Sequence, residues 1–193
     1  GQAVVNPGVP ALEMLNARLR GYVLLGGIES ADLARSPGVE SALQSAECVV
    51  ALTPYAGEEQ MANSTVILPV GAFAETSGTW VNVEGRWQSV AGAARPPGEA
   101  RPAWKVLRVL GNLLDLPGFD YLSSEDVREE IRRELAEVTL VDAPPAAGFQ
   151  LGRLAAVDSS REVGIYRVDA VVRRSRPMQE THDDLQGADG GRG

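Results

Sequence analysis

The stretch VILPVGAFAETSGTWVNVEGRWQ, residues 66–88, decides the fold, because it joins a short apolar run to a turn-rich segment with alternating side chains. Residues 66–68 are all apolar, which predicts a buried strand. Pro69 closes this run, since proline cannot donate a backbone hydrogen bond to a sheet. The Glu-Thr-Ser-Gly sequence at residues 75–78 then predicts a turn.

The side chains beyond that turn predict a β-hairpin. From Thr79 they alternate between two faces, as a half-exposed strand requires. One face carries Trp80, Asn82 and Glu84, and the other carries Thr79, Val81 and Val83. The chain is expected to reverse at Glu84 and Gly85, with Gly85 at positive φ. We therefore expect Asn82 to lie opposite Trp87.

The residues ahead of this stretch predict a Rossmann-like α/β layer. The predicted helices span residues 10–20, 39–46 and 55–62, and the predicted strands span residues 22–25, 48–52 and 66–68. Gly21 is expected to end the first helix. Strands that alternate with short helices favour a parallel sheet. The predicted fold class is therefore α/β, with a parallel or mixed sheet whose strands present loops to a ligand at their carboxyl ends.

Two amphipathic helices are predicted after the hairpin. The first begins at Pro102 and is terminated by the Pro-Gly pair at residues 117–118. Its apolar stripe consists of Trp104, Leu107, Leu110 and Leu114. The second begins with a capping box formed by Ser123 and Asp126 and ends near residue 137. Its Glu and Arg side chains are expected to face water.

Composition divides the chain into three parts. Residues 1–140 form the α/β portion, and residues 141–174 form a linker and a short irregular carboxyl-terminal segment. One more strand is predicted over residues 163–172 in that segment. Residues 175–193 are polar and rich in glycine, which predicts a disordered tail.

The charge of the chain limits the partners it can have. The net charge is -8 and the pI is about 4.8. Nucleic acid and anionic membranes would repel such a chain, so a protein partner is expected. No run of apolar residues approaches the roughly 18 that a membrane span needs, so no direct membrane insertion is expected. Gly1 follows no initiator Met or signal peptide, and we expect the chain to be a piece of a longer polypeptide.

The sequence offers few residues for metal or redox chemistry. It has one cysteine, Cys48, and one histidine, His182. Neither an iron-sulfur cluster nor a structural zinc site can be built from this set. Cys48 lies in an apolar run, which predicts a buried structural thiol, whereas His182 is expected to be solvated. We predict no metal ligand and no catalytic residue on this chain.

Gly26 and Gly27 follow a predicted strand, but they do not make a nucleotide-binding motif. The spacing of a dinucleotide fingerprint is absent, and no P-loop lysine follows. The nearby carboxylates of Glu29 and Asp32 would also repel a phosphate. A tight turn is therefore favoured over a phosphate site.

An ordered set of residues runs through the hairpin and the segment that follows it. The set is Leu68-Pro69, Glu75, Gly78-Thr79, Asn82, Glu84-Gly85-Arg86, Gln88, Pro97-Gly98-Glu99-Ala100-Arg101 and Trp104. It resembles the molybdopterin oxidoreductase superfamily, and within it the large iron-sulfur subunit, of the 75 kDa type, of respiratory complex I. Residues 169–174, with Gln179 and Thr181, are similar to the end of that subunit. The resemblance is strong over residues 64–104 and implies a carboxyl-terminal portion.

The resemblance leaves two functions open for the hairpin. In molybdenum-using relatives this region lies close to a pterin dinucleotide, whose polar edges Asn, Thr, Glu and Arg side chains can bind. The cofactor-binding residues would then be Thr79, Asn82, Glu84, Arg86 and Gln88. The resemblance to the complex I subunit instead implies the same fold without a molybdenum centre, as a structural support with no cofactor on this segment.

We favour the structural scaffold. The basic residues near the loop are Arg86, Arg95 and Arg101, which is little counter-charge for the phosphates of a dinucleotide. In molybdenum-using relatives a long barrel domain helps to enclose the cofactor, and we expect the residues after 137 to give only an incomplete enclosure. Asn82, Glu84 and Arg86 are then expected to hold the turn, while the three tryptophans supply packing or an interface.

The complex I resemblance implies a function for the whole assembly. Electrons would pass from NADH to quinone, coupled to proton translocation, through iron-sulfur clusters on the amino-terminal part of the subunit. The expected partners are other subunits of the peripheral arm. The expected location is peripheral, on the cytoplasmic face of the bacterial inner membrane. The rival is a formate dehydrogenase-like or nitrate reductase-like enzyme.

Overall fold

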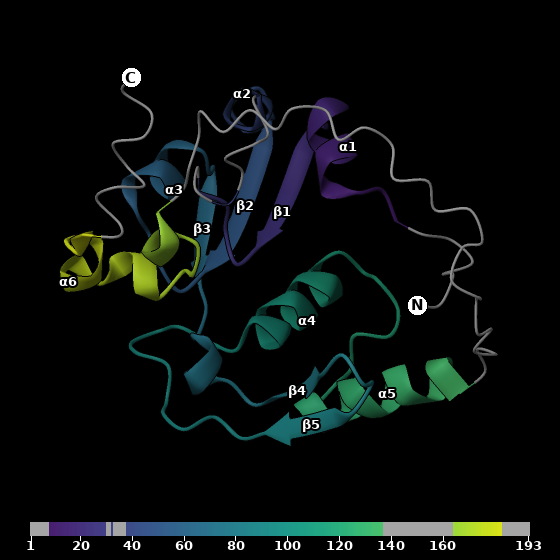
Figure 1. The fold of residues 1–193 in the computed structure, drawn as a ribbon. Helices are drawn as coiled ribbons and strands as arrows, with labels where there is room; N and C mark the ends of the chain where they lie inside the picture. Colours follow the sequence, from purple (N-terminus) through teal and green to yellow (C-terminus); the bar gives the residue numbers. More distant parts are fainter. Residues whose placement is uncertain (1–7, 30–31, 33–37, 137–163, 183–193) are drawn as a thin grey trace, which may run out of the picture. The chain divides into compact units, whose positions relative to one another are not determined.

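The computed structural model describes residues 8–29, 32, 38–136 and 164–182 (Figure 1). The chain forms two compact units. The sheet unit contains Gly1–Val4, Gly21–Gly27 and Cys48–Asp142. The terminal unit contains Val5–Arg20, Ile28–Glu47 and Ala143–Gly193. The predicted division at residues 140 and 174 stays a prediction.

A three-stranded parallel sheet lies at the centre of the sheet unit. Its strands are β1 (Gly21–Leu25), β2 (Cys48–Thr53) and β3 (Val66–Pro69), in the order β1-β2-β3. β2 is the middle strand, and its Val49, Ala51 and Leu52 are almost completely buried, because an apolar strand with neighbours on both sides forms the core. The predicted parallel α/β sheet is confirmed.

The lone thiol of Cys48 lies at the edge of this core. Cys48 is exposed, so the prediction of a buried thiol is wrong. It is the first residue of β2 and pairs with Gly21, whereas burial begins one residue later at Val49. The apolar run in the sequence did not show at which residue burial starts.

The first three helices are shorter than the sequence predicts. They are α1 (Ala11–Asn16), α2 (Val39–Gln44) and α3 (Glu58–Ala62). α1 does not run on to Gly21, because Arg18 has a positive φ of 49° and leaves the helical conformation. Gly21 instead begins β1.

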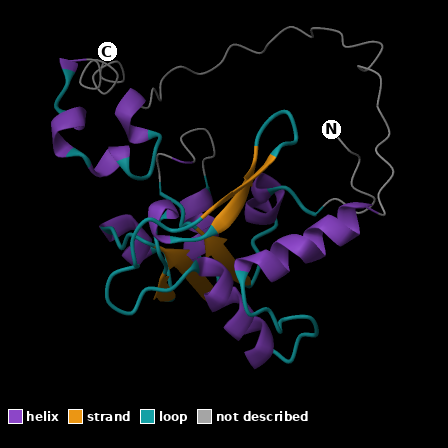
Figure 2. Cartoon of the chain, turned by 90° about the horizontal axis from the view of Figure 1, so that it is seen from below, coloured by secondary structure: helices purple, strands orange, loops and turns teal. Residues whose placement is uncertain are grey.

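A second, antiparallel sheet is formed by the hairpin of β4 (Gly78–Val81) and β5 (Trp87–Val90). Figure 2 shows the strands of both sheets in orange. Val81 pairs with Trp87, so the predicted pairing of Asn82 with Trp87 is wrong by one residue. The loop between the strands is longer than the predicted two-residue reversal at Glu84 and Gly85. Gly85 has a positive φ of 77°, as predicted. A left-handed glycine is typical of hairpin loops longer than two residues.

Two helices follow the hairpin, α4 (Ala103–Leu113) and α5 (Ser124–Ala136), as predicted. α4 ends before the predicted Pro-Gly pair, because Asp115 has φ 53° and the N–H of Leu116 bonds to the carbonyl of Gly111 at 3.0 Å. None of the helices in the described part of the chain is long and apolar enough to cross a membrane.

The predicted capping box begins α5. The backbone N–H of Asp126 donates to Ser123 Oγ at 3.2 Å, and Asp126 Oδ2 accepts the N–H groups of Leu122 at 2.8 Å and Ser123 at 2.9 Å. These bonds, that from the Leu122 N–H foremost, lower the pKa of Asp126 below its ordinary value of 3.8. The ionised carboxylate is therefore the form that stabilises the start of α5.

The capping box predicts a pH-dependent stability. Because the pKa of Asp126 is lower in the folded chain, its contribution is fully present above about pH 3.8 and is lost as the pH falls through the folded-state value. Asp126→Ala should lower the helical stability at pH 6, and the difference from wild type should vanish in acid. Circular dichroism during heating measures this. Glu125→Ala, which removes a carboxylate bonded to the Ser124 hydroxyl, should not reproduce the pH profile.

The carboxyl-terminal segment contains short helical turns. They are the 3-10 helices η3 (Ile165–Arg167) and η4 (Val172–Arg174) and the helix α6 (Arg176–Gln179). The predicted strand over residues 163–172 is therefore wrong. Asp169 Oδ1 accepts the N–H groups of Val171 and Val172 at 2.8 and 2.9 Å, which bends the backbone into a turn. The helix α6 lies at the start of the tail that was predicted to be disordered, residues 175–193. Residues 137–163 and 183–193 lie outside the described residues.

Candidate functional site

The hairpin brings the predicted cofactor-binding residues into one element, and Asn82 uses its side-chain oxygen within the loop itself. Asn82 Oδ1 accepts the backbone N–H of Glu84 at 3.0 Å and that of Arg86 at 2.9 Å. The Asn82 carbonyl also accepts the N–H of Gly85 at 2.9 Å. Asn82 therefore holds the turn through its side chain and its backbone.

Thr79, Glu84 and Arg86 also have partners within the hairpin. Glu84 and Arg86 form an ion pair at 3.8 Å with both side chains about 70% exposed, which contributes at most about 1 kcal/mol. Thr79 Oγ1 lies 3.1 Å from Ser89 Oγ. Gln88 is exposed and pairs with Trp80 across the strands.

Two arginines of α5 hold the hairpin from one face. Arg128 Nη1 donates to Ser89 Oγ at 2.9 Å, and the Arg132 guanidinium lies 5.2 Å from the centre of the Trp87 ring. Sequence reasoning missed both contacts because it expected the charged residues of this helix to face water. The separation of 39 residues between Arg128 and Ser89 leaves no local signal for the pairing.

The hairpin also exposes large apolar side chains. Trp80 is 59% exposed, Val81 is 54% exposed and Val83, at the tip, is fully exposed. Trp87 is half-buried against α5, so packing explains Trp87 but leaves Trp80 in contact with solvent. Exposed aromatic and branched side chains grouped on one element are typical of protein interfaces.

The carboxyl end of the parallel sheet is the second place where a ligand is expected, because the predicted α/β fold presents loops there. Gly26 and Gly27 have φ values of 95° and 77°, and the N–H of Gly26 bonds to the Leu52 carbonyl at 2.8 Å. Gln60 is 1% exposed and donates through Nε2 to Ser64 Oγ at 2.9 Å. A Cβ on Gly27 would lie 2.2 Å from Gln60 Oε1.

Two features of the described part of this edge differ from a phosphate-binding turn. A phosphate cradle needs backbone N–H groups that point at the ligand, whereas the N–H of Gly26 is bonded within the sheet. The space beside Gly27 is filled by the chain's own Gln60 side chain. The favoured tight turn agrees with this geometry.

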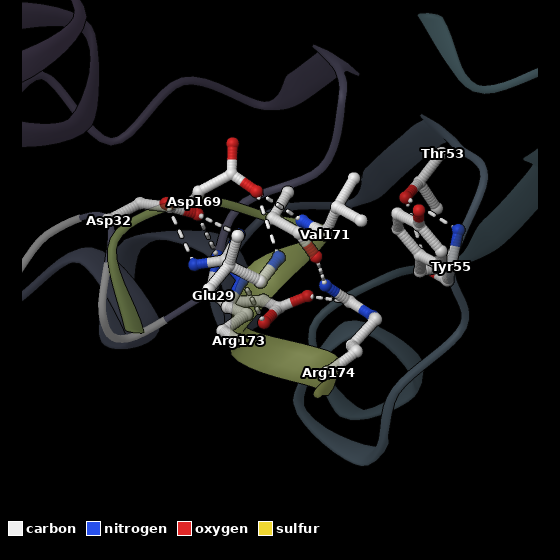
Figure 3. A network of polar contacts seen from close by, with 10 residues as sticks. Glu29, Asp32, Thr53, Tyr55, Asp169, Val171, Arg173 and Arg174 are labelled. Atoms are coloured by element: carbon white, nitrogen blue, oxygen red, sulfur yellow. Dashed lines mark hydrogen bonds and ion pairs between the residues drawn. The ribbon is translucent and has the colours of Figure 1, made fainter. Parts of the chain in front are cut away.

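A network of four charged side chains lies in the terminal unit (Figure 3). Arg173 places its Nη1 and Nη2 atoms 3.0 and 3.2 Å from the two carboxylate oxygens of Asp32. Its Nε lies 3.1 Å from Glu29 Oε2, close enough for an ion pair but not aligned for a hydrogen bond. Arg174 pairs with the other oxygen of Glu29.

Burial and charge act in opposite directions on Arg173. Burial alone would lower the pKa of its guanidinium, but the hydrogen bond to Asp32 and the charges of Asp32, Glu29 and Asp169 together raise the pKa above its ordinary value. The pKa of Asp169 is lowered, first by the Val172 N–H. Sequence reasoning treated Glu29 and Asp32 only as groups that repel phosphate. It did not find their arginine partners, because Arg173 and Arg174 follow 141 or more residues later.

No cluster of three or more His, Cys, Asp or Glu side chains suited to a metal ion occurs within residues 8–29, 32, 38–136 and 164–182. His182 is exposed and is the last residue of the described range 164–182. The absence of metal ligands from the whole chain stays a prediction.

The comparisons with known proteins match the fold described above. The family model of the molybdopterin oxidoreductases matches residues 3–113. The chain is 27% identical over 186 residues to the NADH-ubiquinone oxidoreductase 78 kDa subunit, mitochondrial, of Neurospora crassa, covering 88% of this chain and 23% of the relative. It is 47% identical over 64 residues to the NADH-ubiquinone oxidoreductase 75 kDa subunit of Reclinomonas americana, covering 32% of this chain and 9% of the relative.

A third relative belongs to the other functional class. The F420-dependent formate dehydrogenase subunit alpha of Methanocaldococcus jannaschii is 35% identical over 96 residues, covering 49% of this chain and 14% of the relative. The chain spans less than a quarter of the length of each of these relatives. With its parallel three-stranded sheet and a family match over more than half of its residues, the chain belongs to the molybdopterin oxidoreductase family.

Proposed function

We propose that this chain is a non-catalytic structural part of the large subunit of an NADH-quinone oxidoreductase, respiratory complex I. In this proposal the assembly transfers electrons from NADH to quinone, coupled to proton translocation. The iron-sulfur clusters belong to the amino-terminal part of the subunit. The chain contacts other subunits of the peripheral arm at the cytoplasmic face of the bacterial inner membrane.

The observation that carries the proposal is how the hairpin uses its polar groups. The side-chain oxygen of Asn82 accepts two N–H groups of its own loop, and Glu84 pairs with Arg86. A pterin dinucleotide would need such groups for its own hydrogen bonds. The same hairpin exposes Trp80 and Val83, which suits contact with a neighbouring protein.

The names of two relatives support the same assignment. The Neurospora crassa and Reclinomonas americana proteins are named as subunits of NADH-ubiquinone oxidoreductase. The alignment with the Neurospora crassa protein extends over 88% of this chain. This alignment supports the complex I proposal over most of the chain.

One observation favours a second function, the cofactor-binding part of a molybdopterin-dependent oxidoreductase. The formate dehydrogenase alpha subunit is 35% identical over 96 residues. In that case Thr79, Asn82, Glu84, Arg86 and Gln88 would contact the cofactor, and the native protein would contain molybdenum or tungsten in stoichiometric amount. The loop would then have to exchange its internal bonds for bonds to the cofactor.

The scaffold proposal predicts that Trp80→Ala weakens assembly of the peripheral arm. Trp80 is 59% exposed, and a tryptophan at the centre of an interface contributes about 2 kcal/mol or more, so its partner should bind at least about tenfold more weakly. Blue-native electrophoresis of the complex, with the heat stability of the assembled arm, measures this. The cluster signals of the subunit should be unchanged.

Gln88→Ala is the matched control, because Gln88 pairs with Trp80 across the hairpin and is also exposed. Its assembly should equal that of wild type. If Trp80→Ala also assembles fully and is equally heat-stable, the hairpin is not a contact between subunits.

A further inference from the structure

The terminal unit contains a charge network that joins two segments distant in sequence. Glu29 and Asp32 lie on one turn, with the N–H of Asp32 bonded to the Glu29 carbonyl at 2.9 Å. Arg173 and Arg174 lie on η4 of the carboxyl-terminal segment, 141 residues beyond Asp32 in the case of Arg173. Closing so long a loop costs conformational entropy, which the contacts between the segments must offset.

The guanidinium of Arg173 is bound by the carboxylates of Asp32 and Glu29. Its two terminal nitrogens meet the two oxygens of Asp32 at 3.0 and 3.2 Å, and its Nε faces Glu29 at 3.1 Å. Its side chain is 11% exposed, compared with 22% for Glu29 and 35% for Asp32. Paired forks of this kind are stronger and more specific than single ion pairs.

The neighbouring groups hold the arginines in place. Asp169 bonds to the N–H groups of Val171 and Val172 and so shapes the turn that carries Arg173. Arg174 pairs with Glu29 and also donates to the Ala170 carbonyl at 2.5 Å. Glu29 thus pairs with both arginines, so its loss would remove one carboxylate partner from each of them.

We infer that Glu29 and Asp32 form an intramolecular guanidinium-binding site that latches residues 164–182 onto the turn after Gly27. The latch opens when salt screens its charges. Partial burial makes it stronger than the exposed pairs of the same unit, such as Arg20 with Glu47, whose side chains are 85% and 64% exposed.

Limited trypsin digestion of the intact native polypeptide tests the latch. Trypsin must bind the side chain of Arg173 or Arg174, so the cleavage rate at these bonds follows the fraction of molecules in which the latch is open. The double variant Glu29→Gln with Asp32→Asn keeps both cleavage sites and should be cut there at least about tenfold faster than wild type. Mass spectrometry of the fragments assigns the cuts.

Two further variants keep the test decisive if the double variant folds poorly. Glu47→Gln removes a carboxylate from an exposed ion pair of the same unit and should leave the cleavage rate unchanged. Asp32→Glu keeps the charge and should stay within about twofold of wild type. In about 1 M salt, where the Debye length is about 3 Å, wild type should be cut faster, and the double variant should respond less.

The latch is excluded if the double variant is cut at the wild-type rate. It is also excluded if Glu47→Gln accelerates cleavage as much as the double variant, because the effect would then be a general loss of stability. The test does not depend on the assignment to complex I, since neither assembly nor redox activity is measured.

Discussion

Gly27→Ala should be among the most destabilising single substitutions in the sheet unit. Its new Cβ would lie 2.2 Å from Gln60 Oε1 and 3.0 Å from Gln60 Cδ, well inside van der Waals contact. Gln60 is 1% exposed and bonded to Ser64, so it has little room to move. Alanine at φ 77° adds backbone strain, and strain and overpacking together should cost about 2–4 kcal/mol.

Hydrogen exchange at the β1 and β2 amides measures this cost in the intact protein. Gly26→Ala is the control, because Gly26 also has positive φ but nothing lies within 4 Å of its Cβ position, which leaves only about 1–2 kcal/mol of strain. Gln60→Ala should relieve part of the cost in the Gly27→Ala background. Equal protection in the two glycine variants would show that the Gln60 contact is not rigid.

Gly111→Ala should have the second large effect, on the connection between α4 and α5. Three ring atoms of Phe119 lie 2.3 to 2.7 Å from the position of the new Cβ, so the ring must leave the surface of α4. Alanine gains about 1 kcal/mol of helix propensity over glycine, which offsets part of the loss. A net destabilisation of about 1–3 kcal/mol is expected.

Two measurements test this effect: the thermal unfolding temperature of the variant, and the rate of hydrogen exchange at the amides of α4 and α5. Asn112→Ala is the control on the next residue of the helix, which is exposed, and it should be neutral or slightly stabilising. Phe119→Leu should partly rescue Gly111→Ala, because leucine is smaller than the ring. A stabilised Gly111→Ala variant would contradict the close packing of Phe119 on α4.

Much of the fold could be predicted because its signals are local. The apolar run at β2 and the alternating pattern after Thr79 each depend on residues within a few positions of one another. The capping box of Ser123 and Asp126 is equally local, and the structure contains it. The assignment to the molybdopterin oxidoreductase superfamily came from the family resemblance, because the periodicity of apolar residues does not identify a superfamily.

The errors arise where side-chain bonds override a local pattern. The register of the hairpin was wrong by one residue because Asn82 bonds to two backbone N–H groups and sets the length of the loop. The strand predicted over residues 163–172 is replaced by turns that Asp169 stabilises. The hydrophobic periodicity of the sequence does not reveal the side-chain bonds of Asn82 or of Asp169.

Contacts between distant residues were missed for a different reason. Arg128 reaches Ser89, and Arg173 reaches Asp32, across separations of 39 and 141 residues. A single sequence contains no information about which of several charged residues will meet. The α5 contacts on the hairpin and the latch of the terminal unit therefore emerged only from the structure.

The metal content of the purified native complex that contains this chain tests the scaffold proposal most directly. Elemental analysis for molybdenum and tungsten, with fluorescence of the oxidised pterin after acid release, is done on the intact assembly. If the hairpin serves only as a scaffold, neither metal nor pterin should exceed a matched blank. Molybdenum or tungsten in stoichiometric amount with this chain, together with a released pterin, would contradict the proposal.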